Sequence, residues 1–357
     1  MTETLATLQR VSPLRLRPEL TALLKQPTVE KVRALLEAAV KLEHSTIPPY
    51  LYALYSLGTA GNQAAAEIIR SVVVQEMLHL NLAANVLNAI GGSPVLDSPA
   101  FIPDYPGPLP GMIEHQLTVR LAPCSIGSVQ DMFMVIEQPE DPLEFPVAAV
   151  DSDEQLTIGQ FYRGISDVIS ALGDRIFTGD PRKQVINAIG GAIRVTDVAT
   201  ARTAINIIVD QGEGTSTSPE EQYGTGFAHY YRFAEIVKGR RLIKNPDYRP
   251  PDPPDQKYIY GGEPIPFDPA AVFPVPTDPR NHAPGSLAQR AIDTFNYNYT
   301  GLLKTLHAGF NGDPGVIGSA IGAMFSLRQQ AIEMMSGQST DGLAVGPTFR
   351  WQPVLGG

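Results

Sequence analysis

The sequence of 357 residues is poor in cysteine. Cys124 is the only one, so an intrachain disulfide and a cluster of thiolate ligands are excluded. Any metal ion that the chain binds must therefore be held by oxygen and nitrogen atoms. The sequence also lacks a run of about 18 apolar residues, the length of a membrane-spanning helix, and its N-terminus lacks the apolar stretch of a signal peptide. We therefore expect a soluble, cytoplasmic protein without a membrane partner.

Basic residues are outnumbered by acidic ones. Lys and Arg number 27 against 37 Asp and Glu, which gives a net charge of −10. This balance argues against a nucleic-acid partner and against an anionic membrane surface. The sequence also lacks a nucleophile motif, a phosphate-binding loop and a dinucleotide-binding fingerprint, so it gives no support to those enzyme classes. Apolar residues make up 43% of the chain, enough for a sizeable core in two or three modest domains or one enlarged domain.

Residues 69–90 have the hydrophobic periodicity of a helix that faces a bundle core. Glu76 and His79 occupy two of the core positions, three residues apart and therefore on one face of the helix. A buried, unpaired carboxylate costs roughly several kcal/mol, so it normally has a compensating charge. Glu-x-x-His on an inward face is a unit from which helical bundles build di-iron or di-manganese sites. The alternative is a buried ion pair without a metal.

A third polar residue occupies a core position in the preceding helix, for which Thr28 is the expected N-cap. Glu43 lies in the inward stripe of this helix, so it is available to the same site as Glu76 and His79 when the two helices form an antiparallel hairpin. Pro48-Pro49 frees backbone carbonyls and should kink the helix close to Glu43. The alternative is that the two prolines end one helix and begin another.

Two more side chains of this helix are candidates for roles beside a metal. Tyr50 lies on the same face as Glu43, and we select it as the candidate catalytic residue that lines a pocket, although a core aromatic with a satisfied hydroxyl is the commoner case. His44 lies about 100° around the helix from Glu43. We therefore expect it to support a ligand or to sit in a helix interface rather than to bind metal itself.

Residues 93–155 interrupt the helical rhythm and are expected to form an inserted loop region. Alternating residues at 115–121 predict a strand there. Residues 129–136 are compatible with a short helix or with a strand. His115 and Glu137 are ligands by residue type only, and we expect surface or strand-end positions for both.

Later helices repeat the layout of the first pair. A third helix begins near Thr157 and carries Gln160 beside its apolar stripe. A fourth helix over 197–211 leads to Glu213, which is placed to turn back toward the core, and His229 then takes a core position in the next helical stretch. A single His on an apolar face is usually a satisfied core residue, but the other polar core positions favour a ligand. Four-helix di-metal sites commonly have such a doubled layout.

These patterns predict four regions. They are an N-terminal arm at 1–28, a metal-binding bundle at 29–240 that contains the inserted loop region 93–155, a PPII-like proline-rich connector at 241–285, and a C-terminal helix pair with its tail at 286–357.

Five runs of residues, taken together, resemble one known family: LEHSTIPPYLYALYS, QEMLHLNLAANVLNAIGG, IGQFYRGI, DQGEG and HYYRF. This is the ferritin-like family named for iminophenyl-pyruvate dimer synthase, with related domains in the violacein- and rebeccamycin-pathway enzymes that couple oxidised tryptophan units. The first two runs are specific as a pair, because Glu-His-x-x-Ile-Pro and Glu-x-x-His occur at the right separation. The resemblance covers most of residues 29–240, and the segments that follow also look similar to free-standing members.

The resemblance implies a mainly α fold. We expect a ferritin-like four-helix bundle with long loops, a small β-like insertion and an extra C-terminal helix pair. Ferritin-like sites usually draw a carboxylate from the third helix, but here the nearest residue is Gln160, a poor ligand, so the site is mononuclear or Glu213 bridges two ions. The ligand candidates are Glu43, Glu76, His79, Glu213 and His229.

Carboxylate and imidazole ligands without thiolate suit iron, mononuclear or dinuclear, with manganese or zinc as alternatives. The first functional hypothesis is an O2-dependent oxidase or oxygenase that acts on a small, amino-acid-derived molecule in secondary metabolism. The alternatives are a non-enzymatic metal-binding or iron-handling protein, and a structural module that binds a partner. A homo-oligomer is compatible with each of them.

Overall fold

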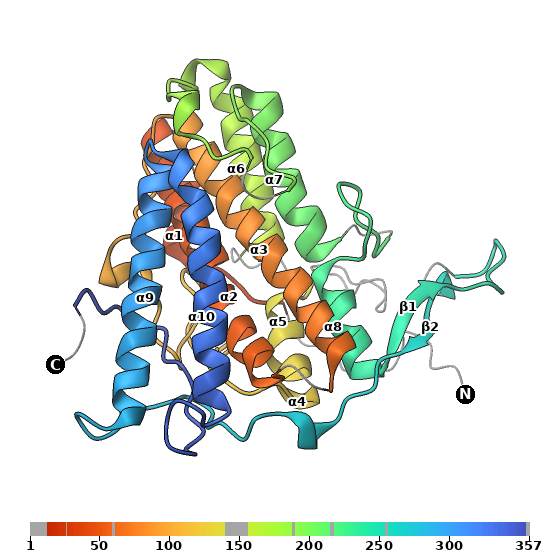
Figure 1. The fold of residues 1–357 in the computed structure, drawn as a ribbon. Coiled ribbons are helices and arrows are strands. Elements are labelled where there is room, and N and C mark those ends of the chain that lie inside the picture. Colours follow the sequence, from red (N-terminus) through yellow and green to blue (C-terminus); the bar gives the residue numbers. More distant parts are fainter. Residues whose placement is uncertain are drawn as a thin grey trace.

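The computed structural model describes residues 13–25, 27–58, 61–139, 156–187, 190–214, 218–253 and 256–354, and it is mainly helical (Figure 1). The α-helices are α1 Pro18–Leu23, α2 Val29–Ser56, α3 Gln63–Ala89, α4 Ile126–Ser128, α5 Met134–Ile136, α6 Ile158–Leu172, α7 Val198–Glu213, α8 His229–Lys238, α9 Leu287–Phe310 and α10 Ile317–Met335. The two strands are β1 Arg240–Lys244 and β2 Tyr258–Pro264.

Four helices form the central bundle. α2 packs along α3 and against α6, and α7 packs along α6 and against α3 (Figure 1). Each helix turns an apolar face inward, and the buried side chains of all four belong to one hydrophobic core. The site described below lies inside this core, where α2 and α3 meet α5 and α8.

α2 runs without interruption through Pro48 and Pro49, so the alternative of two separate helices is wrong. A proline removes the hydrogen bond that its own N–H would make to the carbonyl four residues earlier. The carbonyl of Ser45, freed in this way by Pro49, instead accepts a hydrogen bond from the Tyr105 hydroxyl at 2.6 Å. A side chain of the inserted loop region therefore supports the helix beside Glu43.

Capping boxes begin α6 and α7. At α6 the Thr157 hydroxyl accepts from the Gln160 backbone N–H, and the Gln160 side chain accepts from the Thr157 backbone N–H at 3.0 Å. Asp197 and Thr200 make the corresponding pair at α7. Two donors at each helix start are thus satisfied locally, and the Gln160 side chain serves its own helix end.

The segment at 126–136 is helical rather than extended, which decides the ambiguity of the sequence pattern. A π-helical turn, Val129–Phe133, joins α4 to α5. Both the turn and α5 pack against α8. Because α5 ends at Ile136, the next residue, Glu137, is delivered to the core at only 8% exposure.

The strand predicted at 115–121 is wrong, since the only pairing there is a single bridge between Val119 and Gly107. Alternation alone does not make a strand when no partner with matching register lies beside it. The antiparallel pair β1–β2 forms instead inside the segment for which we predicted a PPII-like connector. Proline is tolerated there because Pro264 lies at the end of β2, where it removes no internal ladder bond.

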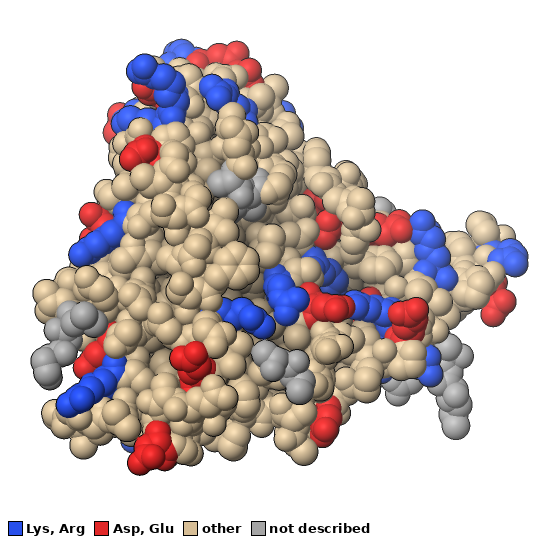
Figure 2. Space-filling model, viewed as in Figure 1, with Lys and Arg blue, Asp and Glu red and all other residues tan. Residues whose placement is uncertain are grey.

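α9 and α10 form a second layer on α2 and α3 (Figure 1). The C-terminal tail packs back onto α9, where the Asn296 amide donates to the Thr348 hydroxyl at 2.8 Å. On the face in Figure 2, acidic and basic side chains are scattered among uncharged ones. None of the helices in the described ranges is both long enough and apolar enough to cross a membrane.

Candidate metal centre

Five titratable side chains converge in the core from four elements. Glu43 comes from α2, Glu76 and His79 from α3, Glu137 from the residue after α5, and His229 from the first position of α8. Their exposed fractions are 6%, 3%, 2%, 8% and 0%, respectively. Ionisable groups are rarely buried to this degree unless they are paired or bind metal.

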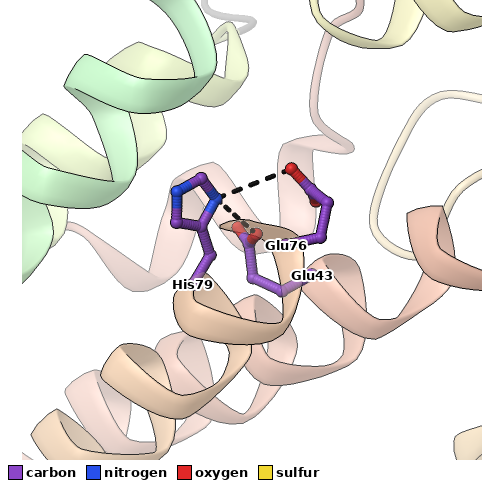
Figure 3. Close-up of side chains that lie close together, drawn as sticks. All are labelled: Glu43, Glu76 and His79. Carbon is purple, nitrogen blue, oxygen red and sulfur yellow. Dashed lines mark ion pairs between the residues drawn. The ribbon is translucent and has the colours of Figure 1, made fainter. Parts of the chain in front are cut away.

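Glu43, Glu76 and His79 form the first group of three. Figure 3 shows both carboxylates directed at the imidazole, whose Nδ1 lies 3.5 Å from Glu43 Oε2 and 3.6 Å from Glu76 Oε1. Bonds of about 2.1 Å to one ion place two of its ligand atoms about 3 to 4 Å apart. The separations in this group therefore match those of ligands around a single metal ion.

Glu76, Glu137 and His229 form the second group. His229 Nδ1 lies 2.9 Å from Glu76 Oε1 and 3.3 Å from Glu137 Oε2. The rings of His79 and His229 are stacked, with centroids 5.4 Å apart and an angle of 23° between their planes. Glu76 belongs to both groups, so its carboxylate lies between two sets of candidate ligands.

Each imidazole has an outer nitrogen, Nε2, on the side away from the carboxylates, and this nitrogen is hydrogen-bonded to a glutamine. His79 Nε2 donates to Gln211 Oε1, and His229 Nε2 donates to Gln75 Oε1, both at 3.0 Å. An amide oxygen only accepts, so these contacts keep the proton on Nε2. They leave Nδ1 directed at the carboxylates, which is the orientation that a metal ligand requires.

Gln75 has further polar contacts of its own. Gln75 Oε1 also accepts from Arg232, and the Gln75 amide donates to Glu221 at 3.1 Å. Arg232 lies 3.7 Å from Glu221 and further donates to Ser71. A charged network therefore supports the His229 side of the centre.

Each carboxylate accepts a hydrogen bond from a hydroxyl. Tyr162 donates to Glu43, Thr46 to Glu76 at 2.6 Å, and Tyr50 to Glu137 at 2.5 Å. Burial and the neighbouring carboxylates raise the pKa values of Tyr50 and Tyr162 well above their ordinary range. Both phenols therefore keep their protons and act as donors that orient the carboxylates.

Three carboxyl groups face two imidazoles in the centre. Burial lowers the pKa of His79, but the carboxylates of Glu43 and Glu76 outweigh it and raise that pKa to about 10. Burial raises the pKa of Glu43 and also that of Glu137, because the ionised form of each would place a charge away from water. Burial raises the pKa of Glu76 as well, but both imidazoles outweigh it and the net shift is downward. Two protonated histidines would balance two of the three carboxylates, and the third would need a proton of its own or a bound cation.

A cavity of about 50 Å³ adjoins the carboxylates of Glu43, Glu76 and Glu137. Its volume suits water or another ligand of a few atoms rather than a large organic molecule. Much of the wall is apolar and comes from Leu42, Leu109, Ile136, Ile158, Ile208 and Val209.

The structure brings four of the five predicted ligands together: Glu43, Glu76, His79 and His229. The Glu213 side chain lies outside the described residues. From the sequence we expected a surface or strand-end position for Glu137, and this was wrong, since Glu137 follows a helix, is buried and contacts His229. The signal that was available is its position directly after the apolar run at 132–136.

The other predicted residues have separate places. Tyr50 contacts the centre through Glu137 rather than through the cavity wall. His44 faces α9, where its Nε2 lies 2.7 Å from the Tyr299 hydroxyl. The third helix contributes Tyr162 instead of a carboxylate, two residues beyond Gln160.

Comparison with known proteins identifies the family. A family model described as ferritin-like matches residues 36–238, which is more than half of the chain. This chain belongs to the ferritin-like family. The family resemblance stated from the five sequence runs is thereby confirmed, as is the expected class of fold.

Two relatives extend this result. The sequence is 24% identical over 391 aligned positions to dichlorochromopyrrolate synthase of Lentzea aerocolonigenes, and the match covers 89% of this chain but 35% of that protein. The fold is similar to the crystal structure of a ferritin-like protein from Caulobacter vibrioides, with a TM-score of 0.62 and 24% identity. That match covers 91% of this chain and 99% of the other. The chain thus spans about a third of its curated relative and nearly all of its structural one.

Proposed function

We propose that this protein binds two divalent metal ions and uses them, with O2, to oxidise a small organic molecule. The observation that carries the proposal is the carboxylate of Glu76, which belongs to both buried groups of candidate ligands. One ion would be held by Glu43, Glu76 and His79. The other would be held by Glu76, Glu137 and His229, so that Glu76 would serve as a ligand in both groups.

The donor atoms fit the ions named from the sequence. Oxygen and imidazole nitrogen suit iron, manganese or zinc, and the ligand separations suit bonds of about 2.1 Å. Iron, when bound, would transfer electrons from the organic molecule to O2. The chain's own part is to exclude water, to orient the ligands through the hydroxyls of Thr46, Tyr50 and Tyr162, and to fix the imidazoles through glutamines.

Tyr50 has a positioning role in this proposal. Its hydroxyl donates to Glu137 Oε1 at 2.5 Å, and its ring packs edge-on against Phe133 at a centroid distance of 4.6 Å. It therefore acts on the reaction through Glu137, whereas the sequence alone suggested a residue that touches substrate.

The substrate class is proposed from the relative named as a synthase of dichlorochromopyrrolate. We propose an oxidisable, amino-acid-derived molecule of secondary metabolism. The coupling reaction itself is not transferred, because this chain matches only 35% of that protein. The alternative of an iron-handling protein predicts O2 consumption that does not depend on an organic molecule.

The test begins with protein purified without chelator and loaded with Fe(II) under anaerobic conditions. The proposal predicts two iron ions per chain by elemental analysis and an optical change when O2 is admitted. Candidate amino-acid-derived compounds should then increase O2 uptake, and His79→Ala should abolish the increase. Iron uptake with O2 consumption unaffected by every compound would favour iron handling, and no iron uptake would overturn the metal proposal.

A further inference from the structure

Gly212 lies in the last turn of α7, at the wall of the cavity beside the carboxylates. A Cβ atom added at this position would lie 3.9 Å from Glu137 Oε2, an ordinary van der Waals distance. Apart from its chain neighbours and the backbone of its own helix, it would meet no closer heavy atom among the described residues. The missing side chain of Gly212 therefore corresponds to space inside the cavity.

The fold itself does not require glycine at this position. Gly214, two residues further on, has a φ of +74°, a left-handed conformation that favours glycine at a helix end. Gly212 lies within α7 and does not have a positive φ. The described residues around it leave room for a methyl group. Alanine has the higher helix propensity, so within the described part of the chain neither backbone geometry nor packing accounts for glycine here.

From this contrast we infer that Gly212 determines the size of the external ligand that reaches the metal pair. The inference rests on the proposed function. A methyl group is about as large as a water molecule, whose share of liquid volume is about 30 Å³. Placed in the cavity of about 50 Å³, it would occupy part of the space next to Glu137.

The chemistry of the wall indicates the ligand class. Leu42, Leu109 and Ile208 offer no hydrogen bond to a polar ligand, whereas they favour transfer of a small apolar molecule out of water. A diatomic molecule such as O2 fits both this chemistry and the volume. Gly212 is thus a residue that determines specificity for a small apolar ligand, separate from the side chains that hold the ions.

The test uses Gly212→Ala, Gly212→Val and the control Gly301→Ala. Gly301 also lies within a helix, α9, but a Cβ atom there would meet nothing within 4 Å. Each protein is loaded with Fe(II) without oxygen, its iron content and melting temperature are measured, and nitric oxide is titrated as a diatomic probe. We expect Gly212→Ala to keep its iron, to melt at the same or a higher temperature, and to bind nitric oxide at least tenfold more weakly. Gly212→Val should bind it more weakly still, and Gly301→Ala should match the wild type.

Wild-type affinity for nitric oxide in a fully loaded Gly212→Ala protein would overturn the inference and leave the proposed function standing. Loss of iron from Gly212→Ala would also overturn it, because Gly212 would then support the metal ions rather than limit their ligand. Failure of the wild type to take up iron would overturn the proposed function itself. If the valine variant does not fold, the alanine variant decides.

Discussion

Two buried histidines in this protein have opposite electrostatic surroundings. His79 and His44 are only 2% and 3% exposed. Burial lowers the pKa of His79, but the neighbouring carboxylates outweigh it and raise that pKa to about 10. His44 contacts the Phe101 ring at a centroid distance of 4.4 Å and the Tyr299 hydroxyl, and burial, with a smaller effect from Lys41, lowers its pKa to about 3.

The difference shows what distinguishes a candidate metal ligand from a core residue. Burial is common to both histidines, so burial alone is not informative. Of the two, only His79 lies in a centre where carboxyl groups outnumber imidazoles. We therefore expect substitutions on the His79 side to change metal content, and substitutions around His44 to change stability alone.

The largest expected effect comes from Glu76→Ala. Because Glu76 belongs to both groups of ligands, its loss should remove both iron ions, whereas Glu43→Ala and Glu137→Ala should each remove one. Elemental analysis after anaerobic loading measures this. Glu37→Ala is the matched control, since Glu37 is an exposed carboxylate on the same helix as Glu43. Equal iron content in Glu76→Ala and Glu37→Ala would contradict the assignment.

A smaller effect is expected from the glutamines that hold the outer nitrogens. Gln211→Leu and Gln75→Leu each remove the acceptor of one imidazole, and changes of this kind typically weaken metal binding about 10–100-fold. Each variant should weaken the binding of one ion and leave the affinity for the other near its wild-type value. Competition with a graded series of chelators measures the two affinities. If each variant lost affinity for both ions equally, the glutamines would not act on separate ions.

The smallest effect is expected on the His44 side. His44→Phe leaves the buried Tyr299 hydroxyl without its hydrogen-bond partner, which should lower the free energy of unfolding by about 1–3 kcal/mol. His44→Phe combined with Tyr299→Phe removes both polar groups and should recover much of that loss. Denaturant unfolding measures the stability, and iron content should stay at the wild-type level in both variants. Iron loss in either variant would break the distinction between the two histidines.

The sequence predicted the part of the centre that lies on regular helices. Glu43, Glu76 and His79 stand out because long, periodic helices make a polar residue in a core position visible. His229 was visible for the same reason, although α8 begins at that residue. These predictions needed only local periodicity and knowledge of which residue types bind metal.

The remaining features depend on contacts between distant segments. Glu137 lies 92 residues from His229 and follows a π-helical turn, for which the sequence has no clear period. The strand predicted at 115–121 did not form, because a strand requires a partner with which to pair, and only one bridge is made there. β1 and β2 formed elsewhere, where each has the other as a partner. Gln160 is a case in which the local signal was present, since Thr-x-x-Gln is a capping-box pattern.

The most direct test of the two-ion centre is anomalous diffraction at the iron absorption edge from crystals grown with Fe(II) without oxygen. The account predicts two peaks inside the bundle, both next to the Glu76 carboxylate, one on the side of Glu43 and His79 and the other on the side of Glu137 and His229. A fully loaded crystal with a single peak, or with peaks only at the surface, would contradict it.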